Sequence, residues 1–237
     1  MHMSHKKKPV IQQYKMGNSI LQETDHHPYL GVELSKDLSW SKHINQVTAG
    51  ANKILGLLKR NLRCCDEKTK ATAYKTLVRP KLVYCSSIWD PHKHTHIETV
   101  EKVQRRAARF VCNAYKRETS VTHLLHELKW EKLATRRQKA RLTIIFKEFN
   151  SLAPSNIINR KFTPQDQNGR STRNNHPNNL KRINVNKDCY KHALYPYTIP
   201  EWNLLPAEVK STENLKHFRS QLDNIDHEEL SKKAHFN

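Results

Sequence analysis

The sequence predicts a mainly α-helical fold with a small antiparallel β element at its N-terminal end. Only five of the 237 residues are glycine, whereas Leu, Lys, Arg and Ala, which favour helices, are frequent. Apolar residues also recur at intervals of three and four positions over long segments, as they do along one face of a helix. These two features favour a helical bundle over a loop-rich sandwich or barrel.

The β element is predicted over residues 1–40. Residues 10–16 and 19–21 flank Gly17-Asn18, a dipeptide typical of two-residue hairpin turns. The segment Tyr29–Leu34 predicts a further strand, and Asp37 begins the turn that leaves it.

The first long helix is predicted from Ser41 to Leu62. Its apolar stripe at 3.6-residue spacing consists of Ile44, Val47, Ala51, Ile54, Leu55, Leu58 and Leu62. Lys42, Lys53 and Arg60 fall on the opposite side.

Two further helices follow this one. Asp66 is expected to cap a helix that carries Tyr74, Leu77 and Val78, and Pro80 either kinks that helix or splits it from residues 81–89. A third helix is expected to begin at Thr95, with Glu98 completing a capping box. Its apolar positions are Ile97, Val100, Val103, Ala107, Phe110 and Val111.

The same third helix carries a basic stripe on its other face. Lys102, Arg105, Arg106 and Arg109 are spaced three and four residues apart, with no acidic residue between the first and the last. A solvated helix face usually mixes the two signs of charge, so this stripe is the leading candidate for phosphate contacts, and a plain solvated face is the alternative. A second basic cluster, with Arg136 and Arg137, is spread around a later helix.

The rest of the chain predicts shorter elements. Ser120 should cap a short helix, and a largely buried helix should run from about residue 131 to 152 and end before Pro154. We therefore divide the chain into a β element (1–40), a basic helical domain (41–153), a polar loop or linker (154–199) and a C-terminal amphipathic helix with a tail (200–237). The last helix is expected to begin near Thr212 and to carry Leu215, Phe218 and Leu222.

Charge is the strongest functional signal in the composition. Lys and Arg number 42 against 22 Asp and Glu, for a net charge of +20, and residues 41–152 alone hold 24 basic and 9 acidic residues. Such a field favours a polyanion such as nucleic acid as the partner, while a solubilising surface is the less specific interpretation. Five Cys without framework spacing, no signal-peptide pattern and no long apolar run predict an intracellular protein of the nucleus or cytoplasm, not bound to membrane.

Other chemistry has little support in the sequence. His92-Lys-His-Thr-His96 lies near Cys85 and Asp90, yet no second ligand pair has zinc-site spacing, so surface histidines are the preferred interpretation. No nucleophile elbow, Walker loop or dinucleotide-binding glycine motif occurs. We therefore predict no catalytic residues, metal or cofactor. Stacking on bases is one use for the four Trp residues, Trp40, Trp89, Trp130 and Trp202, but we favour core positions for all four.

Several short motifs occur in a characteristic order: Tyr29-Leu-Gly-Val32, Leu38-Ser-Trp40 with His43-Ile44, Val78-Arg-Pro-Lys-Leu-Val-Tyr84, Trp89-Asp-Pro91, Val103-Gln-Arg-Arg-Ala-Ala-Arg109, Leu128-Lys-Trp130 with Arg136-Arg137, and Trp202-Asn-Leu-Leu-Pro206. Together they resemble the C-terminal part of jockey-like reverse transcriptases from non-long-terminal-repeat retrotransposons, over roughly residues 10–222.

This resemblance implies a role for each region. Tyr29, Leu30, Gly31 and Val32 would match the primer-grip turn at the end of the palm, and the helices from Ser41 onward would match the thumb and the region after it. A thumb holds the primer–template duplex by its backbone, which suits a face of Lys and Arg. The implied phosphate-binding residues are Lys53, Arg60, Lys102, Arg105, Arg106, Arg109, Arg136 and Arg137.

The sequence also departs from the family. Polymerisation needs paired Asp side chains that hold two Mg²⁺ ions, and the family carries them in an Asp-Asp turn upstream of the primer grip. No Asp-Asp occurs in this chain, so no catalytic residue can be carried over. We therefore expect a non-catalytic fragment of an RNA-directed DNA polymerase that binds an RNA–DNA hybrid or other duplex without sequence specificity, with a separate palm and fingers polypeptide as a further partner. The alternatives are a protein-interaction module, an inert remnant of a degenerate element, and a cryptic metal-dependent nuclease.

Overall fold

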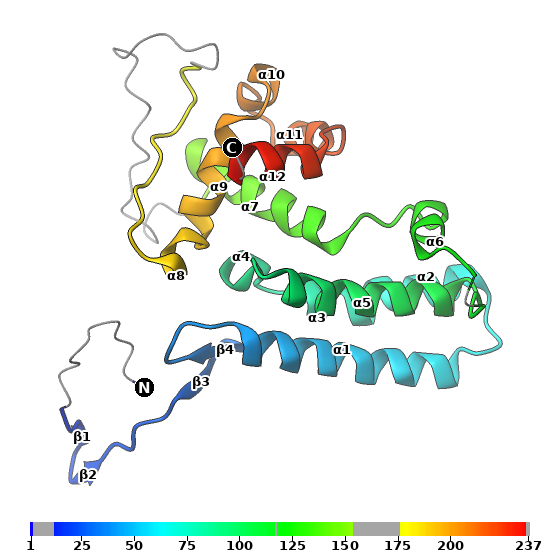
Figure 1. Cartoon of the computed structure of the whole chain (residues 1–237), viewed down its shortest axis with the longest axis horizontal. Helices are drawn as coiled ribbons and strands as arrows, with labels where there is room; N and C mark the ends of the chain where they lie inside the picture. Colours follow the sequence, from blue (N-terminus) through cyan, green and yellow to red (C-terminus); the bar gives the residue numbers. More distant parts are fainter. Residues whose placement is uncertain (2–11, 117, 154–175, 236–237) are drawn as a thin grey trace. The chain divides into compact units, whose positions relative to one another are not determined.

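The computed structural model describes residues 1, 12–116, 118–153 and 176–235 and is mainly helical, as the composition predicts (Figure 1). The predictions for Val10, for Pro154 and for residues 154–175 of the predicted linker lie outside these residues. The chain divides into two compact units: residues 1–85 with 91–128, and residues 86–90 with 129–237. The predicted basic domain 41–153 therefore spans both units, because the long helix near residue 140 packs with the C-terminal segments.

Two small antiparallel hairpins precede the helices of the first unit. The strands are β1 (Lys15–Met16), β2 (Ser19–Ile20), β3 (His26–Tyr29) and β4 (Val32–Ser35). Met16 pairs with Ser19, so Gly17-Asn18 forms the predicted two-residue turn. Tyr29–Leu34 is not one strand, however. Tyr29 pairs with Val32 across a turn in which Leu30 and Gly31 both have positive φ, of 46° and 80°.

The helices of the first unit are α1 (Ser41–Asn61), α2 (Glu67–Ala73), the π-helical turn η1 (Tyr74–Val78), α3 (Arg79–Val83), α5 (His94–Val111) and α6 (Val121–Glu127). The predicted caps Asp66 and Ser120 accept hydrogen bonds from the backbone N–H groups of Thr69 and His123. Helical residues run without a gap from Glu67 through the π turn to Val83, so Pro80, which lies at the start of α3, does not split residues 81–83 from the second helix.

The capping box predicted at Thr95 is wrong. Helix α5 begins at His94, and its N-terminal boundary residue Lys93 makes no side-chain capping hydrogen bond. The Thr95 carbonyl instead accepts a hydrogen bond from the Thr99 hydroxyl, and Glu98 pairs with Arg105. The Glu98 carboxylate, which the sequence pattern assigns to a cap at the helix start, therefore pairs with a residue two turns further along the helix.

The core of the first unit lies between α1, η1, α3 and α5. Leu55, Leu58 and Val103, all predicted to be core, are 2%, 6% and 1% exposed. The other buried apolar residues of these helices are Ile44, Ala51, Tyr74, Val78, Leu82, Val100, Ala107, Ala108, Phe110 and Val111. Helices α1 and α5 run parallel, because His96 lies beside Ser41 and Arg106 beside Asn52, pairs separated by 55 and 54 residues.

The helices of the second unit are α4 (Ser86–Trp89), α7 (Leu133–Phe149), α8 (Asp188–Lys191), α9 (Leu194–Asn203), α10 (Ala207–Lys210), α11 (Leu215–Leu222) and α12 (His227–His235). The later part of the predicted linker 154–199 is thus helical. The last predicted helix starts at Leu215, because the side chain of Asn214 caps it. Most of the predicted tail forms α12. The carboxylate of Asp226 caps the start of this helix by accepting hydrogen bonds from the backbone N–H groups of Glu228 and Glu229.

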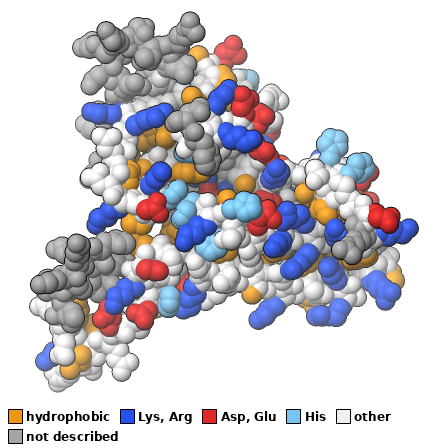
Figure 2. All heavy atoms as spheres, in the orientation of Figure 1, with side chains coloured by type: hydrophobic (Ala, Val, Ile, Leu, Met, Phe, Trp, Pro, Cys, Tyr) orange, Lys and Arg blue, Asp and Glu red, His pale blue; other side chains and the backbone are white. Residues whose placement is uncertain are grey.

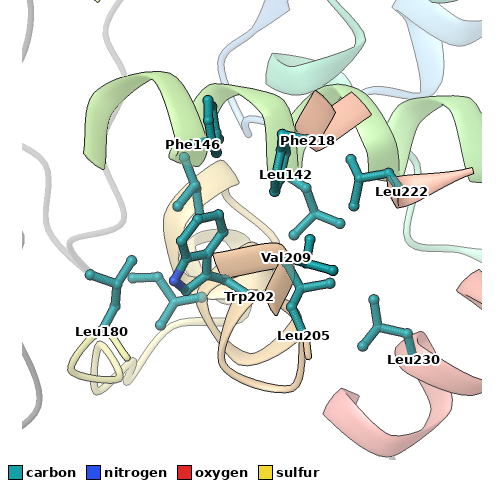
Figure 3. Packing of buried hydrophobic residues seen from close by; sticks show 11 residues of the cluster. Leu142, Phe146, Leu180, Trp202, Leu205, Val209, Phe218, Leu222 and Leu230 are labelled. Carbon is teal, nitrogen blue, oxygen red and sulfur yellow. The ribbon is translucent and has the colours of Figure 1, made fainter. Parts of the chain in front are cut away.

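An apolar cluster around Trp202 is the core of the second unit (Figure 3). The ring of Phe146 stacks on that of Phe218 with 4.2 Å between centroids, and the indole of Trp202 lies 6.0 Å from Phe218. Trp89, Trp130 and Trp202 are buried, which confirms their predicted core positions, whereas Trp40 in the first unit is only half-buried. All five Cys are free thiols, and no described helix has the length and apolar character needed to cross a membrane.

Candidate nucleic-acid interface

Helix α1 carries basic residues and no carboxylate along its 21 residues. Lys53 and Arg60 are exposed on the side away from the core, as predicted. Lys42 is also exposed, but its ammonium lies 2.7 Å from Glu33, and this pairing lowers the pKa of the Glu33 carboxyl. The unneutralised charge of α1 therefore lies in its second half.

The basic stripe of α5 lies largely at the surface. Lys102 and Arg106 are exposed, and Arg105 and Arg109 are partly exposed. Figure 2 shows Lys and Arg side chains gathered over the part of the first unit where α1, α3 and α5 lie in Figure 1. Lys102, Arg106 and Arg109 are spaced as i, i+4 and i+7, so they form one row along the helix.

Three members of the stripe already have polar partners within the chain, and those of Arg105 and Arg109 come from the same helix or the residues after it. Arg105 forms an ion pair with Glu98, and its guanidinium lowers the pKa of that carboxyl. The Arg109 guanidinium donates to the carbonyl of Lys116 over 3.4 Å. Glu98 lies outside the acid-free interval between Lys102 and Arg109, yet it still reaches the stripe. Arg105 is therefore the weakest of the four candidates for contact with an external anion.

A polar seam joins α1 to α5 beside this row. Arg106 Nη1 donates to Asn52 Oδ1 at 3.2 Å. Burial lowers the pKa of Lys59, and the positive charge of Arg106 lowers it further. Among the described residues, no carboxylate oxygen lies within 4.0 Å of the Lys59 ammonium or the Arg106 guanidinium. Two cations thus act on each other at the seam without an acid between them.

Lys59 is a candidate that sequence reasoning missed. It lies at the border between the buried stripe of α1 and the exposed side that carries Lys53 and Arg60. Helical periodicity does not predict whether a residue at such a border is buried or exposed. The proximity of Lys59 to Arg106 depends on packing between two helices that are distant in the sequence.

The second basic cluster has acidic partners within its own unit. The Arg137 side chain is 1% exposed, and its Nε lies 2.7 Å from Asp90 Oδ1. Arg136 pairs with Glu131 at 2.7 Å, and Lys139 lies 2.6 Å from both Glu131 and Asp223. Arg137 is therefore occupied within the second unit, so its predicted role as a phosphate contact has no support in this geometry.

A buried network continues from Arg137 along α7. Arg141 pairs with Asp90 and with the carboxylate of Glu201, which its Nη2 reaches at 3.0 Å. Gln138 donates to the same carboxylate at 2.9 Å, and the Arg141 guanidinium lies over the ring of Tyr197 at 4.9 Å. These groups neutralise one another, which is the arrangement of an internal scaffold.

The turn that resembles a primer grip projects from the β3–β4 hairpin. Tyr29 and Leu30 are 60% and 74% exposed at its tip, whereas Val32 is buried. The Tyr84 hydroxyl donates to the carbonyl of Leu30 at 3.0 Å, and a Cβ on Gly31 would lie 3.4 Å from the Tyr84 ring. The turn is thus held against the end of α3 with two apolar side chains facing outward.

Two histidines of residues 92–96 lie at the start of a helix. His94 and His96 lie in the first turn of α5, and His96 Nε2 is 3.4 Å from the hydroxyl of Ser41. Burial lowers the pKa of His96, and the neighbouring charge of Lys93 adds to this effect. This histidine therefore serves the contact between α1 and α5.

Comparisons with protein-family models, with curated proteins and with solved structures find no match to this chain. The resemblance to reverse transcriptases therefore stays a prediction from the sequence motifs.

Proposed function

We propose that the first unit binds nucleic-acid duplex through its phosphates, without catalysis and without sequence specificity, as a piece of a retrotransposon-type RNA-directed DNA polymerase would. The observation that carries this proposal is the pair of parallel helices α1 and α5. The first has no carboxylate, and the second presents the row Lys102, Arg106 and Arg109. Contacts of this kind neutralise phosphates and position a duplex but read no bases.

The location of the unpaired charge supports the first unit over the second. On α7, four of the five basic residues have carboxylate partners: Arg136 with Glu131, Arg137 with Asp90, Lys139 with Asp223 and Arg141 with Glu201. Among the carboxylates of the described residues, Glu98 is the one that forms an ion pair with the stripe on α5. Excess positive charge that is not neutralised internally attracts a polyanion and makes the affinity dependent on salt.

The test is duplex binding measured over a range of salt concentrations. Lys102→Ala, Arg106→Ala and Arg109→Ala combined should reduce the slope of log affinity against log salt by roughly two to three, because each phosphate contact releases condensed counterions. The loss should be similar on duplexes of unrelated sequence. Circular dichroism should show unchanged helicity, since none of the three side chains is in the core.

A matched control removes equal charge from the second unit. Lys181→Ala, Arg182→Ala and Arg219→Ala change three exposed cations and should leave the slope nearly unchanged. Equal losses in both triple variants would contradict a defined interface on α1 and α5. Binding to an acidic polypeptide as tight as binding to duplex of equal charge would favour a protein-interaction module instead.

A further inference from the structure

We propose that Asn52, Gly56 and Lys59 of α1, together with Arg106 of α5, form a seat for a single phosphate group. The inference rests on the proposed function in taking the phosphodiester of a duplex as the ligand, and free inorganic phosphate shares the same chemistry. Asn52, Gly56 and Lys59 are spaced as i, i+4 and i+7, so they share one side of α1. Arg106 reaches that side, because it contacts Asn52.

The charges of the seat are unfavourable until an anion arrives. Lys59 is partly buried, and its pKa is lowered by that burial and by the charge of Arg106. A folded protein does not gain from placing two such cations at one helix seam with no acid beside them. A phosphate between them would reverse both effects, because it supplies the missing negative charge to each cation.

The donors at the seam also suit phosphate oxygens. Asn52 Oδ1 holds one N–H of Arg106, which orients a guanidinium that has five N–H donors in all. The amide N–H₂ of Asn52 and the ammonium of Lys59 add further donors from α1. A group with several acceptor oxygens and a negative charge satisfies this set better than water or a carbonyl does.

Gly56 provides the space. A glycine inside a helix is less stable than alanine, so its presence calls for a reason. Packing offers none, because a Cβ at Gly56 would meet only Arg60 Nη1, at 3.9 Å. Between Asn52 and Lys59, the missing side chain leaves the backbone open to close approach by a ligand.

The first experiment uses Lys59→Gln in the full chain. In chloride buffer this variant should melt at a higher temperature than the wild type, because the repulsion from Arg106 is removed. Inorganic phosphate at constant ionic strength should raise the melting temperature of the wild type more than that of the variant. On duplex, the slope of log affinity against log salt should fall by about one.

The second experiment uses a matched pair of glycines. Gly50→Ala and Gly56→Ala both raise helix propensity in α1, and a Cβ at Gly50 meets nothing within 4 Å. Gly56→Ala should weaken duplex binding several-fold, whereas Gly50→Ala, which lies nearly opposite Asn52 and Lys59 on α1, should leave it unchanged. Equal affinities for the two variants would overturn the proposal.

The outcomes separate the seat from the interface. If Lys102→Ala/Arg106→Ala/Arg109→Ala loses salt dependence but Lys59→Gln does not, the seat is refuted and the interface stands. If the wild type binds no duplex, the proposed function fails. The melting temperatures measured with and without inorganic phosphate then test the seat by themselves. If phosphate then raises the melting temperature of the wild type more than that of Lys59→Gln, the seat binds free phosphate. An equal rise in both proteins refutes the seat.

Discussion

Glu201→Gln is the most informative change in the second unit. Glu201 is fully buried on α9, where its carboxylate accepts from Arg141 Nη2 at 3.0 and 3.2 Å and from Gln138 Nε2 at 2.9 Å. His235 of α12 approaches it at 3.4 Å. The substitution keeps the size of the side chain, removes its charge and turns one acceptor into a donor.

The expected loss is about 3 kcal/mol of unfolding free energy at neutral pH. Removal of one partner from a buried ion pair typically costs about 3–5 kcal/mol, because the other charge stays buried without compensation. We expect the lower end, because Arg141 retains its ion pair with Asp90. The new amide N–H₂ must also face the donors of Arg141 or Gln138, so relaxation of the site cannot remove the whole cost.

The pH dependence gives a second signature of the same group. Burial opposes ionisation of Glu201, but the charge of Arg141, its hydrogen bonds and the nearby ring of His235 outweigh this effect, so the pKa of Glu201 is lowered. A lowered carboxyl pKa stabilises the folded state above the unfolded-state pKa, and this stabilisation is lost as pH falls through the folded-state value. The difference between wild type and Glu201→Gln should therefore be largest near neutral pH and shrink in acid.

Urea unfolding followed by tryptophan fluorescence measures this change. Three of the four Trp residues, Trp89, Trp130 and Trp202, lie in the second unit, so the signal reports mainly on it. Glu208→Gln is the control, since Glu208 is exposed on α10 and its change should cost less than about 0.5 kcal/mol. A loss below about 1 kcal/mol for Glu201→Gln, or one that does not vary with pH, would show that the network does not hold the unit together.

Three further predictions concern the rest of the chain. Asp in place of Leu55, Leu58 or Val103 should destabilise the first unit by several kcal/mol, because each position is buried; an unchanged melting temperature in all three variants would mean that the helix faces are misplaced. Asp66→Ala should lower the melting temperature at neutral pH and have little effect in strong acid, because the hydrogen bond with Thr69 lowers the pKa of Asp66 and this cap is lost as pH falls through that pKa; an equal effect at both pH values would argue against the cap. The purified chain should extend no primer in Mg²⁺ and nucleotides, because it has no Asp-Asp pair; template-dependent synthesis free of contaminating polymerase would contradict this.

Many local signals in the sequence predicted the local structure, although the capping box at Thr95 did not form. The apolar stripe of α1, the Gly17-Asn18 turn and the caps at Asp66 and Ser120 each depend on a few neighbouring residues, and all four are confirmed. The turn at Leu30-Gly31 was missed, although Gly31 is a common turn residue, because a Leu with positive φ is uncommon. The hydrogen bond that holds this turn is donated to the Leu30 carbonyl by the hydroxyl of Tyr84, which lies 54 residues further along the chain.

The candidate site was predicted less completely, because it depends on which charges find partners. Arg106 and Arg137 look alike in the sequence, each one of an adjacent basic pair on a helix. In the structure, Arg137 is enclosed with Asp90, 47 residues earlier in the chain, whereas Arg106 meets the neutral amide of Asn52. Periodicity places a side chain on a face but says nothing about the acid that packing brings to it.

This difference in neutralisation is the physical basis for assigning different roles to the two units. A basic cluster that pairs with carboxylates of its own unit is already neutralised. Substitution of such residues should therefore lower the stability of the fold. The cations at the seam of α1 and α5 have no such partners, and the pKa of Lys59 is lowered by burial and by Arg106. Their removal should leave stability unchanged or raise it while weakening anion binding. Substitution of Glu201 or Arg141 should therefore lower stability, and it should lower affinity as well only if binding needs the second unit. Substitution of Lys59 should instead raise stability and lower affinity.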